Sequence, residues 1–126
     1  SLISALVDAK VPEIEVGAFV SPKAVPAMAG TDELFADLAA SLKNNSSLFS
    51  ALIPNMKGFE LAMSAKVPLM SLVVATSNTM NLKNIRMTTH DSVSVSKDVL
   101  KAAKKQGANV QAYVATAWAC PFEGKI

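Results

Sequence analysis

The feature that most constrains the fold is a set of four short, nearly uninterrupted apolar segments. They are rich in Val, Ile, Leu, Ala and Phe, do not alternate with polar residues, and span residues 13–19, 48–53, 70–75 and 110–115. Strands that alternate with polar residues have one face in solvent, whereas continuous apolar strands are covered on both faces, as in parallel sheets. The four segments therefore predict a parallel sheet with a strand at each.

Segments with helical periodicity separate these predicted strands. Apolar residues spaced as one stripe of an amphipathic helix are typical of such segments. The stripes consist of Leu34, Phe35, Leu38, Ala39 and Leu42; Phe59, Ala62 and Met63; and Val95, Val99, Ala102 and Ala103. We expect Asp91 or Ser92 to cap the last helix at its start and Gly107 to end it. Residues 1–9 resemble the tail of a further helix.

The alternation of strands and helices predicts right-handed β/α crossovers, with the four strands adjacent in chain order. Such units form either an open doubly wound sheet or part of a (β/α)₈ barrel. A complete barrel needs about 250 residues, and the chain has 126. We interpret residues 1–126 as one partial domain of the α/β class, about half of a TIM barrel.

Composition excludes several classes of partner and environment. The net charge of +2 is too small to indicate nucleic acid or a membrane surface, and no apolar run reaches the roughly 18 residues of a membrane span. We expect Lys101, Lys104 and Lys105 to form the solvated face of a helix. Cys120 is the sole cysteine, which excludes an internal disulfide and favours a reducing, intracellular compartment. The sequons at Asn44 and Asn45 are then expected to be unmodified.

Several stretches after the predicted strands resemble one enzyme family. They read "IEVGAFVSPKAVPAM", "LIPNMKGFELAM", "KNI" and "YVATAWACPFEGKI", and the resemblance extends over essentially the whole chain. The family is hydroxymethylglutaryl-CoA lyase, of the metal-dependent (β/α)₈-barrel lyases and synthases. The resemblance implies cleavage of 3-hydroxy-3-methylglutaryl-CoA to acetyl-CoA and acetoacetate, with Mg²⁺ or Mn²⁺ as cofactor.

The resemblance also implies that parts of the family's site lie outside these residues. The family's Arg-Asp pair precedes Ser1, and its His-x-His metal ligands and catalytic cysteine loop follow Ile126. The chain then corresponds to strands two to five, holds none of the protein metal ligands, and is inactive alone. We expect His90 to have a surface or capping role.

Glu15 is the catalytic candidate that the resemblance selects. It matches a glutamate that faces the family's metal site at the end of the second strand, where a carboxylate can accept hydrogen bonds from metal-bound water. Nothing in the family matches Glu13, which we expect to pair with a lysine on the barrel rim.

The substrate-binding candidates are Asn84, Thr88, Gln111 and Tyr113. Asn84 and Thr88 match a region that contacts the acyl-CoA, and Tyr113 matches a tyrosine close to the substrate. Gln111 stands where the family has an arginine, which removes a strong donor for a carboxylate or carbonyl. We expect Glu15, Asn84 and Tyr113 to converge at the C-terminal ends of the strands.

Two further residues differ from the family, and one motif resembles the catalytic cysteine motif of the family. Ala18 replaces a serine of the family, and Asn78 replaces a glutamate, so the acyl group could be changed or the activity weakened. The Cys-Pro-aromatic run at Cys120 matches a non-catalytic site of the family. Because no His or Lys adjoins Cys120 in the sequence, we expect a buried structural thiol with no lowered pKa.

Two alternative functions stay open at this point. The chain could belong to a condensing synthase of the same barrel group, such as an isopropylmalate or homocitrate synthase. It could also be a non-catalytic half-barrel that binds or pairs with another chain, because parallel strands exposed at both edges need covering. For the enzyme we expect an acyl-CoA substrate, a homo-oligomer, and a location in the cytoplasm or the mitochondrial matrix.

Overall fold

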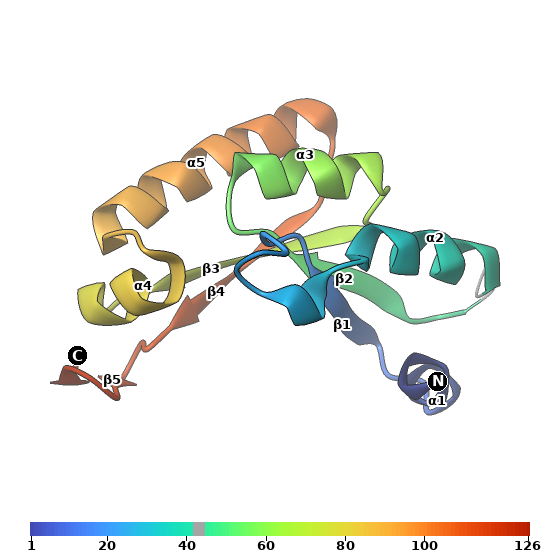
Figure 1. Ribbon diagram of the computed structural model, residues 1–126, viewed down its shortest axis with the longest axis horizontal. Helices are drawn as coiled ribbons and strands as arrows, with labels where there is room; N and C mark the ends of the chain where they lie inside the picture. Colours follow the sequence, from blue (N-terminus) through green and yellow to red (C-terminus); the bar gives the residue numbers. More distant parts are fainter. Residues whose placement is uncertain (42–44) are drawn as a thin grey trace.

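The computed structural model describes residues 1–41 and 45–126, and contains one parallel four-stranded sheet in the order β1-β2-β3-β4 (Figure 1). The strands are β1 (Glu13–Ala18), β2 (Leu48–Leu52), β3 (Leu69–Ala75) and β4 (Val110–Ala115). Each pairs in parallel with its neighbour in the chain. The predicted strands, their parallel direction and their order are confirmed, with bounds that differ by one residue at most.

The helices are α1 (Leu2–Asp8), α2 (Thr31–Ser41), α3 (Met56–Ser64), α4 (Asn78–Ile85) and α5 (Thr89–Gln106), with a 3₁₀ turn at Pro26–Met28. α1 precedes β1, whereas α2, α3 and α5 cover one face of the sheet (Figure 1). The helix tail expected at residues 1–9 corresponds to α1, and the three predicted stripes correspond to α2, α3 and α5. Leu42 of the first stripe and the sequon residue Asn44 lie outside the described residues. Among the described residues, no helix has both the length and the apolar character needed to cross a membrane.

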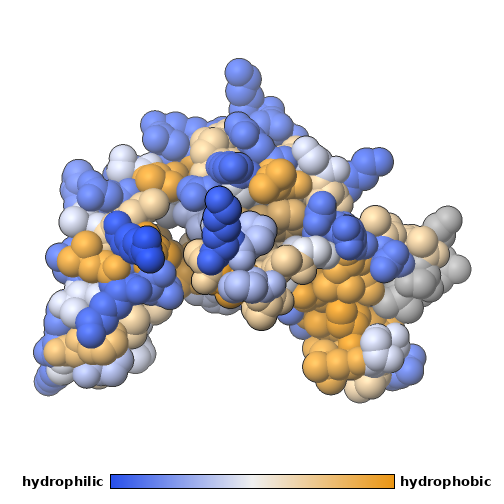
Figure 2. Space-filling view, in the orientation of Figure 1, coloured by the Kyte–Doolittle hydropathy of each residue, from blue (hydrophilic) through white to orange (hydrophobic). Residues whose placement is uncertain are grey.

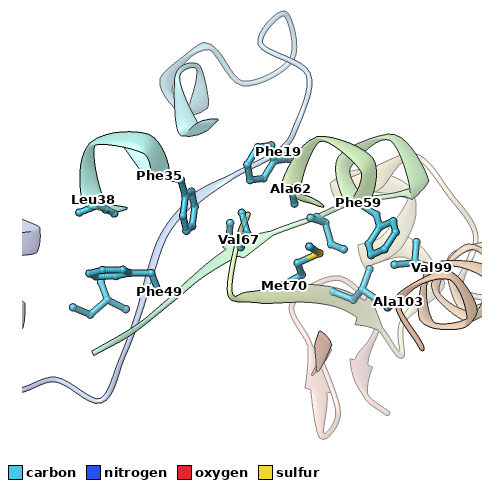
Figure 3. Packing of buried hydrophobic residues seen from close by; sticks show 14 residues of the cluster. Phe19, Phe35, Leu38, Phe49, Phe59, Ala62, Val67, Met70, Val99 and Ala103 are labelled. Atoms are coloured by element: carbon cyan, nitrogen blue, oxygen red, sulfur yellow. The ribbon is translucent and has the colours of Figure 1, made fainter. Parts of the chain in front are cut away.

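The hydrophobic core lies between the sheet and these helices (Figure 3). Phe49, Ala51 and Ile53 occupy alternate positions along β2 and the residue after it, so their side chains point to the helical side. Phe35 of α2 stacks against Phe19, with ring centroids 6.3 Å apart. Phe59 and Val99 bring α3 and α5 onto the same cluster. The core therefore covers one face of the sheet, and the opposite face carries both polar and apolar side chains.

The surface over the helices is mainly hydrophilic, and the expectation for the lysines is met. Figure 2 shows hydrophilic residues over α3 and α5, and hydrophobic residues exposed below α2 towards α1. Lys101, Lys104 and Lys105 are exposed on α5. His90 is also exposed, and its ring lies 3.7 Å from Asp91. These positions agree with the surface roles predicted for them.

The cap predicted for α5 was wrong. Thr88 is the N-cap: its hydroxyl accepts a hydrogen bond from the Asp91 N–H at 3.0 Å and donates to the Asp91 carboxylate at 2.7 Å. Thr88 has the extended backbone that a cap requires, and Asp91 lies in the first turn, where the helix dipole favours a negative charge. The hydrogen bond from Thr88 also lowers the pKa of the Asp91 carboxyl. Gly107 ends the helix with positive φ, as predicted.

Two elements were not predicted from the sequence. Residues 78–85, for which the sequence predicted no helix, form α4, which Ser77 caps by accepting a hydrogen bond from the Met80 N–H at 3.2 Å. After β4, the chain forms a small antiparallel hairpin of β5 (Ala119–Cys120) and β6 (Gly124–Lys125). Both elements lie beyond the C-terminal ends of β3 and β4.

Candidate functional site

The face of the sheet opposite the helices carries the candidate site, and we call it the inner face. Strand registry places Glu15 beside Ser50, Ser71 beside Gln111, and Val73 beside Tyr113. Residues at alternate positions of a strand share a face, so these side chains lie on the same side of the sheet. The polar residues of the inner face are Glu13, Glu15, Ser50, Ser71, Gln111 and Tyr113, and Leu52 and Val73 are among its apolar residues.

An irregularity in β1 brings a further residue to this face. Glu15 pairs with Ser50 and Ala18 pairs with Leu52, with the register shift between Glu15 and Gly17. From Glu15 to Ala18, β1 advances by three residues while β2 advances by two. The extra residue in β1 puts Ala18 on the same side of the sheet as Glu15 and turns Gly17 towards α2. Bulges commonly re-aim side chains next to functional sites.

A hydrogen-bonded network centred on Gln111 connects all four strands. The Gln111 Nε2 lies 2.6 Å from the Glu13 Oε1, 3.1 Å from the Ser71 Oγ and 3.0 Å from the Tyr113 hydroxyl. The Ser50 hydroxyl donates to the same Glu13 oxygen at 3.0 Å. Ser50 and Ser71 are fully buried beneath these longer side chains. The network therefore satisfies two buried hydroxyls and holds Gln111 and Tyr113 side by side.

The pairing predicted for Glu13 was wrong. Its carboxylate binds Ser50 and Gln111, and the ion pairs found among the described residues involve His90 with Asp91 and Lys101 with Asp98 instead. Glu13 starts β1 on the inner face, where the neighbouring strands present a hydroxyl and an amide in place of a lysine.

Glu15, two residues along the same strand, is exposed on the inner face. Within residues 1–41 and 45–126, no hydrogen bond or ion pair to its carboxylate is found. Its carboxylate is therefore open to a ligand on this face, unlike that of Glu13.

The other substrate-binding candidates have different surroundings. Gln111 and Tyr113 are in contact, and Tyr113 keeps 44% of its surface exposed. Asn84 is exposed on α4, and the Thr88 hydroxyl is engaged in capping α5. The structure thus brings together two of the four predicted residues, and the convergence of Asn84 with Glu15 and Tyr113 stays a prediction.

Asn81 was missed by sequence reasoning, although it organises the end of β3. It is 2% exposed, accepts from the Ala75 N–H at 3.0 Å, and donates to the Ala75 carbonyl and to the Thr89 hydroxyl, each at 2.8 Å. Pairing between β2 and β3 ends at Ser71, so the Asn81 amide takes the place of a strand partner for Ala75. The signal in the sequence was the Ser-x-x-x-Asn spacing after an apolar strand.

Cys120 lies in a second polar cluster at the hairpin. The thiol is 4% exposed, donates to the Ser77 hydroxyl at 3.0 Å, and accepts from the Phe122 N–H at 3.4 Å. Burial disfavours the thiolate, but the hydrogen bonds of Ser77, Phe122 and Glu123 outweigh it and lower the pKa of the thiol. The burial was predicted correctly, whereas the expectation of no lowered pKa was wrong because these partners are distant in sequence or on the backbone.

Glu123 and Phe122 attach the same hairpin to α4. The Glu123 carboxylate accepts from the Thr79 N–H at 2.7 Å, and Thr79 is the main cause of the lowered pKa of the Glu123 carboxyl. The Lys83 ammonium lies 4.0 Å from the centre of the Phe122 ring, a cation–π distance. The loop end of the hairpin is thereby held against the helix.

The described residues do not provide a complete metal site. No group of three or more His, Cys, Asp or Glu side chains that could hold a metal ion occurs in this part of the chain. Glu15 is the one inner-face carboxylate that is not engaged by neighbouring side chains described here. A resident divalent cation would need further ligands from residues outside this segment.

Comparison with known proteins places this arrangement in a family. A (R)-citramalyl-CoA lyase of Chloroflexus aurantiacus and a hydroxymethylglutaryl-CoA lyase of Pseudomonas mevalonii are each 36% identical to the chain and match 99% of it. The crystal structure of a hydroxymethylglutaryl-CoA lyase from Brucella melitensis superposes with a TM-score of 0.89 over 99% of the chain, at 32% identity.

The chain spans 42%, 40% and 43% of the lengths of these three proteins. The parallel strands and helices therefore correspond to part of the (β/α)₈ barrel of these lyases, as the sequence predicted. The HMGL-like family model matches residues 1–124, and the chain belongs to that HMGL-like family of lyases.

Proposed function

We propose that the protein containing this chain is a carbon–carbon lyase acting on a 3-hydroxyacyl-CoA. The expected family reaction cleaves 3-hydroxy-3-methylglutaryl-CoA to acetyl-CoA and acetoacetate. The names of the related lyases support a CoA thioester. The observation that carries the proposal is the exposed Glu15 carboxylate on the inner face of the sheet, beside the network of Gln111 and Tyr113.

The proposed chemistry is a retro-aldol cleavage. A base removes the proton of the 3-hydroxyl, the bond between C2 and C3 breaks, and its electron pair moves to C2 as the enolate of the thioester. An acid then protonates C2. Glu15 is the group of this chain that could accept or orient the hydroxyl proton, while Gln111 and Tyr113 would bind the acyl group.

The remaining parts of the proposal concern the domain, the cation, the CoA portion and the assembly. Residues 1–126 would form a single partial domain that contributes strands two to five. A divalent cation, Mg²⁺ or Mn²⁺, would be held by ligands elsewhere in the protein and supply Lewis-acid chemistry. Asn84 and Thr88 would contact the CoA portion. We further propose a homo-oligomer in an intracellular compartment, the cytoplasm or the mitochondrial matrix, which the single cysteine supports.

The test is acetyl-CoA release by the full-length protein with Mg²⁺, from hydroxymethylglutaryl-CoA and from (R)-citramalyl-CoA, the substrate class named for one relative. We expect Glu15→Gln to lower kcat by about 10²–10⁴-fold, the usual range for a proton-transfer group. The control is Glu33→Gln, an exposed carboxylate on α2, on the other side of the sheet. Residues 1–126 alone should be inactive.

Other results would favour the alternatives. Turnover that requires acetyl-CoA and a keto acid would indicate a condensing synthase. No turnover of any thioester by the full-length protein, together with a uniform assembly in size-exclusion chromatography, would indicate a non-catalytic binding module.

A further inference from the structure

The Glu13 carboxylate is unusual because it meets Gln111 across two intervening strands. The two residues lie on β1 and β4, the outer strands of the described sheet, and their oxygen and nitrogen are 2.6 Å apart. Hydrogen bonds in which one partner is charged are shorter and about twice as strong as neutral ones. This contact is therefore the strongest single constraint on the Gln111 side chain.

Glu13 determines which way the amide of Gln111 faces. With the amide reversed, its carbonyl oxygen would lie against the carboxylate oxygen, and two acceptors would repel each other. With the NH₂ group towards Glu13, one of its two protons goes to the carboxylate. The second is shared between the Ser71 and Tyr113 oxygens, at 3.1 and 3.0 Å.

In this orientation, the Gln111 carbonyl oxygen and the Tyr113 hydroxyl proton are both available to a ligand. Among the described residues, no donor is found for the Gln111 carbonyl oxygen. The Tyr113 hydroxyl accepts from Gln111, so its own proton is free to be donated elsewhere. A hydroxyl group, which both donates and accepts, complements this pair, whereas a carboxylate offers only acceptors.

We propose that Glu13 is a positioning residue, which fixes the Gln111 amide so that Gln111 and Tyr113 recognise a terminal hydroxyl on the 3-hydroxyacyl group in place of a terminal carboxylate. The proposal rests on the acyl-CoA lyase function given above and narrows its substrate class. The negative charges of Glu13 and Glu15 on the same face add to the discrimination against a carboxylate.

The orientation of Gln111 can be tested without any substrate. In ¹⁵N-labelled protein, the side-chain amide signal of Gln111 is assigned by its loss in Gln111→Leu. We expect its bonded proton to be shifted downfield in the wild type and to move towards the ordinary position in Glu13→Gln. Glu15→Gln removes the same charge from the same face two residues away, and should leave the signal in place. An unchanged signal in a folded Glu13→Gln protein would overturn the positioning role.

The recognition is tested in the full-length protein with two non-cleavable thioether analogues that share the 3-hydroxyl and differ only at C5. The first is an analogue of 3,5-dihydroxy-3-methylvaleryl-CoA, which ends in a hydroxyl, and the second is an analogue of 3-hydroxy-3-methylglutaryl-CoA, which ends in a carboxylate. We expect the wild type to bind the first about tenfold more tightly, equivalent to 1.4 kcal/mol. Glu13→Gln should reduce this ratio to about twofold, because an amide that is no longer held by a carboxylate can present either its NH₂ donor or its oxygen acceptor to the ligand. Circular dichroism checks that the variant is folded.

The outcomes separate the two proposals. Tighter binding of the carboxylate analogue by the wild type, or an unchanged ratio in Glu13→Gln, overturns the recognition of a hydroxyl. If neither analogue binds the wild type, the acyl-CoA function and the recognition both fail. The amide signal would then still decide whether Glu13 positions Gln111.

Discussion

Replacement of Asn81 by alanine should detach the end of β3 from α4 and α5. The substitution removes three hydrogen bonds, two to the backbone of Ala75 and one to the Thr89 hydroxyl. Each such bond contributes about 1 kcal/mol net, and a buried donor left without a partner costs about 1–3 kcal/mol. The Ala75 carbonyl keeps a weaker contact from Thr89 at 3.4 Å, so the Ala75 N–H is the group that is orphaned.

The two lost bonds from the Asn81 NH₂ and the unpaired Ala75 N–H together give an expected loss in free energy of unfolding of about 3–5 kcal/mol, a large fraction of the roughly 5–15 kcal/mol that a domain has. In urea unfolding followed by circular dichroism, slopes of about 1–3 kcal/mol/M convert this loss to a lower midpoint by at least about 1 M. Asn84→Ala is the matched control, because Asn84 is exposed on the same helix. We expect it to change stability by less than about 0.5 kcal/mol. Equal midpoints for the two variants would refute the role assigned to Asn81.

Three further predictions concern the hairpin and the bulge. Thr79 lowers the pKa of the Glu123 carboxyl below its ordinary value of about 4.5. The contribution of Glu123 to stability is therefore fully present above about pH 4.5 and is lost as the pH falls through the lowered pKa. Thermal unfolding of Glu123→Gln, measured against pH, should lack this loss. For Gly17→Ala, a Cβ would lie 2.7 Å from the Thr31 hydroxyl oxygen, so we expect about 1–3 kcal/mol of destabilisation in urea; stability equal to wild type would show that α2 can shift freely. The lowered pKa of Cys120 predicts that its reaction with iodoacetamide rises with pH at a lower midpoint than the reaction of a cysteine in an unstructured peptide, while burial keeps the reaction slower. A midpoint equal to or above that of the peptide would contradict the assigned hydrogen bonds.

The strands and their order could be predicted because each depends on a local pattern. Continuous apolar runs such as that of β3 specify burial on both faces, and alternation with helices specifies parallel pairing. The helix α4 was missed because its eight residues carry a weak apolar stripe, so its existence depends on the Ser77 cap and on the buried Asn81. The contacts of Asn81 join α4 to β3 and α5, whereas the periodicity of apolar residues is assessed within one segment at a time.

The candidate site, like the fold, could be predicted from the sequence only in part. Glu15, Gln111 and Tyr113 were selected from the sequence by resemblance, and strand registry confirms that they share a face. The engagement of Glu13 could not be anticipated, since its partner Gln111 is 98 residues away in the chain. The choice between a rim lysine and this partner depends on how far β1 is displaced relative to β4, which no local pattern contains.

The two fully buried serines beneath that contact have a consequence for the shape of the sheet and for its evolution. Neighbouring strands lie about 4.8 Å apart, so β1 and β4 would be about 14 Å apart in a flat sheet. The direct bond between Glu13 and Gln111 requires curvature, and the small side chains of Ser50 and Ser71 leave the room for it. A leucine at either serine would force the outer strands apart and open the curve. Positions 13, 50, 71 and 111 should therefore change as a group among natural relatives, with large residues at 50 or 71 accompanied by the loss of the acid–amide pair.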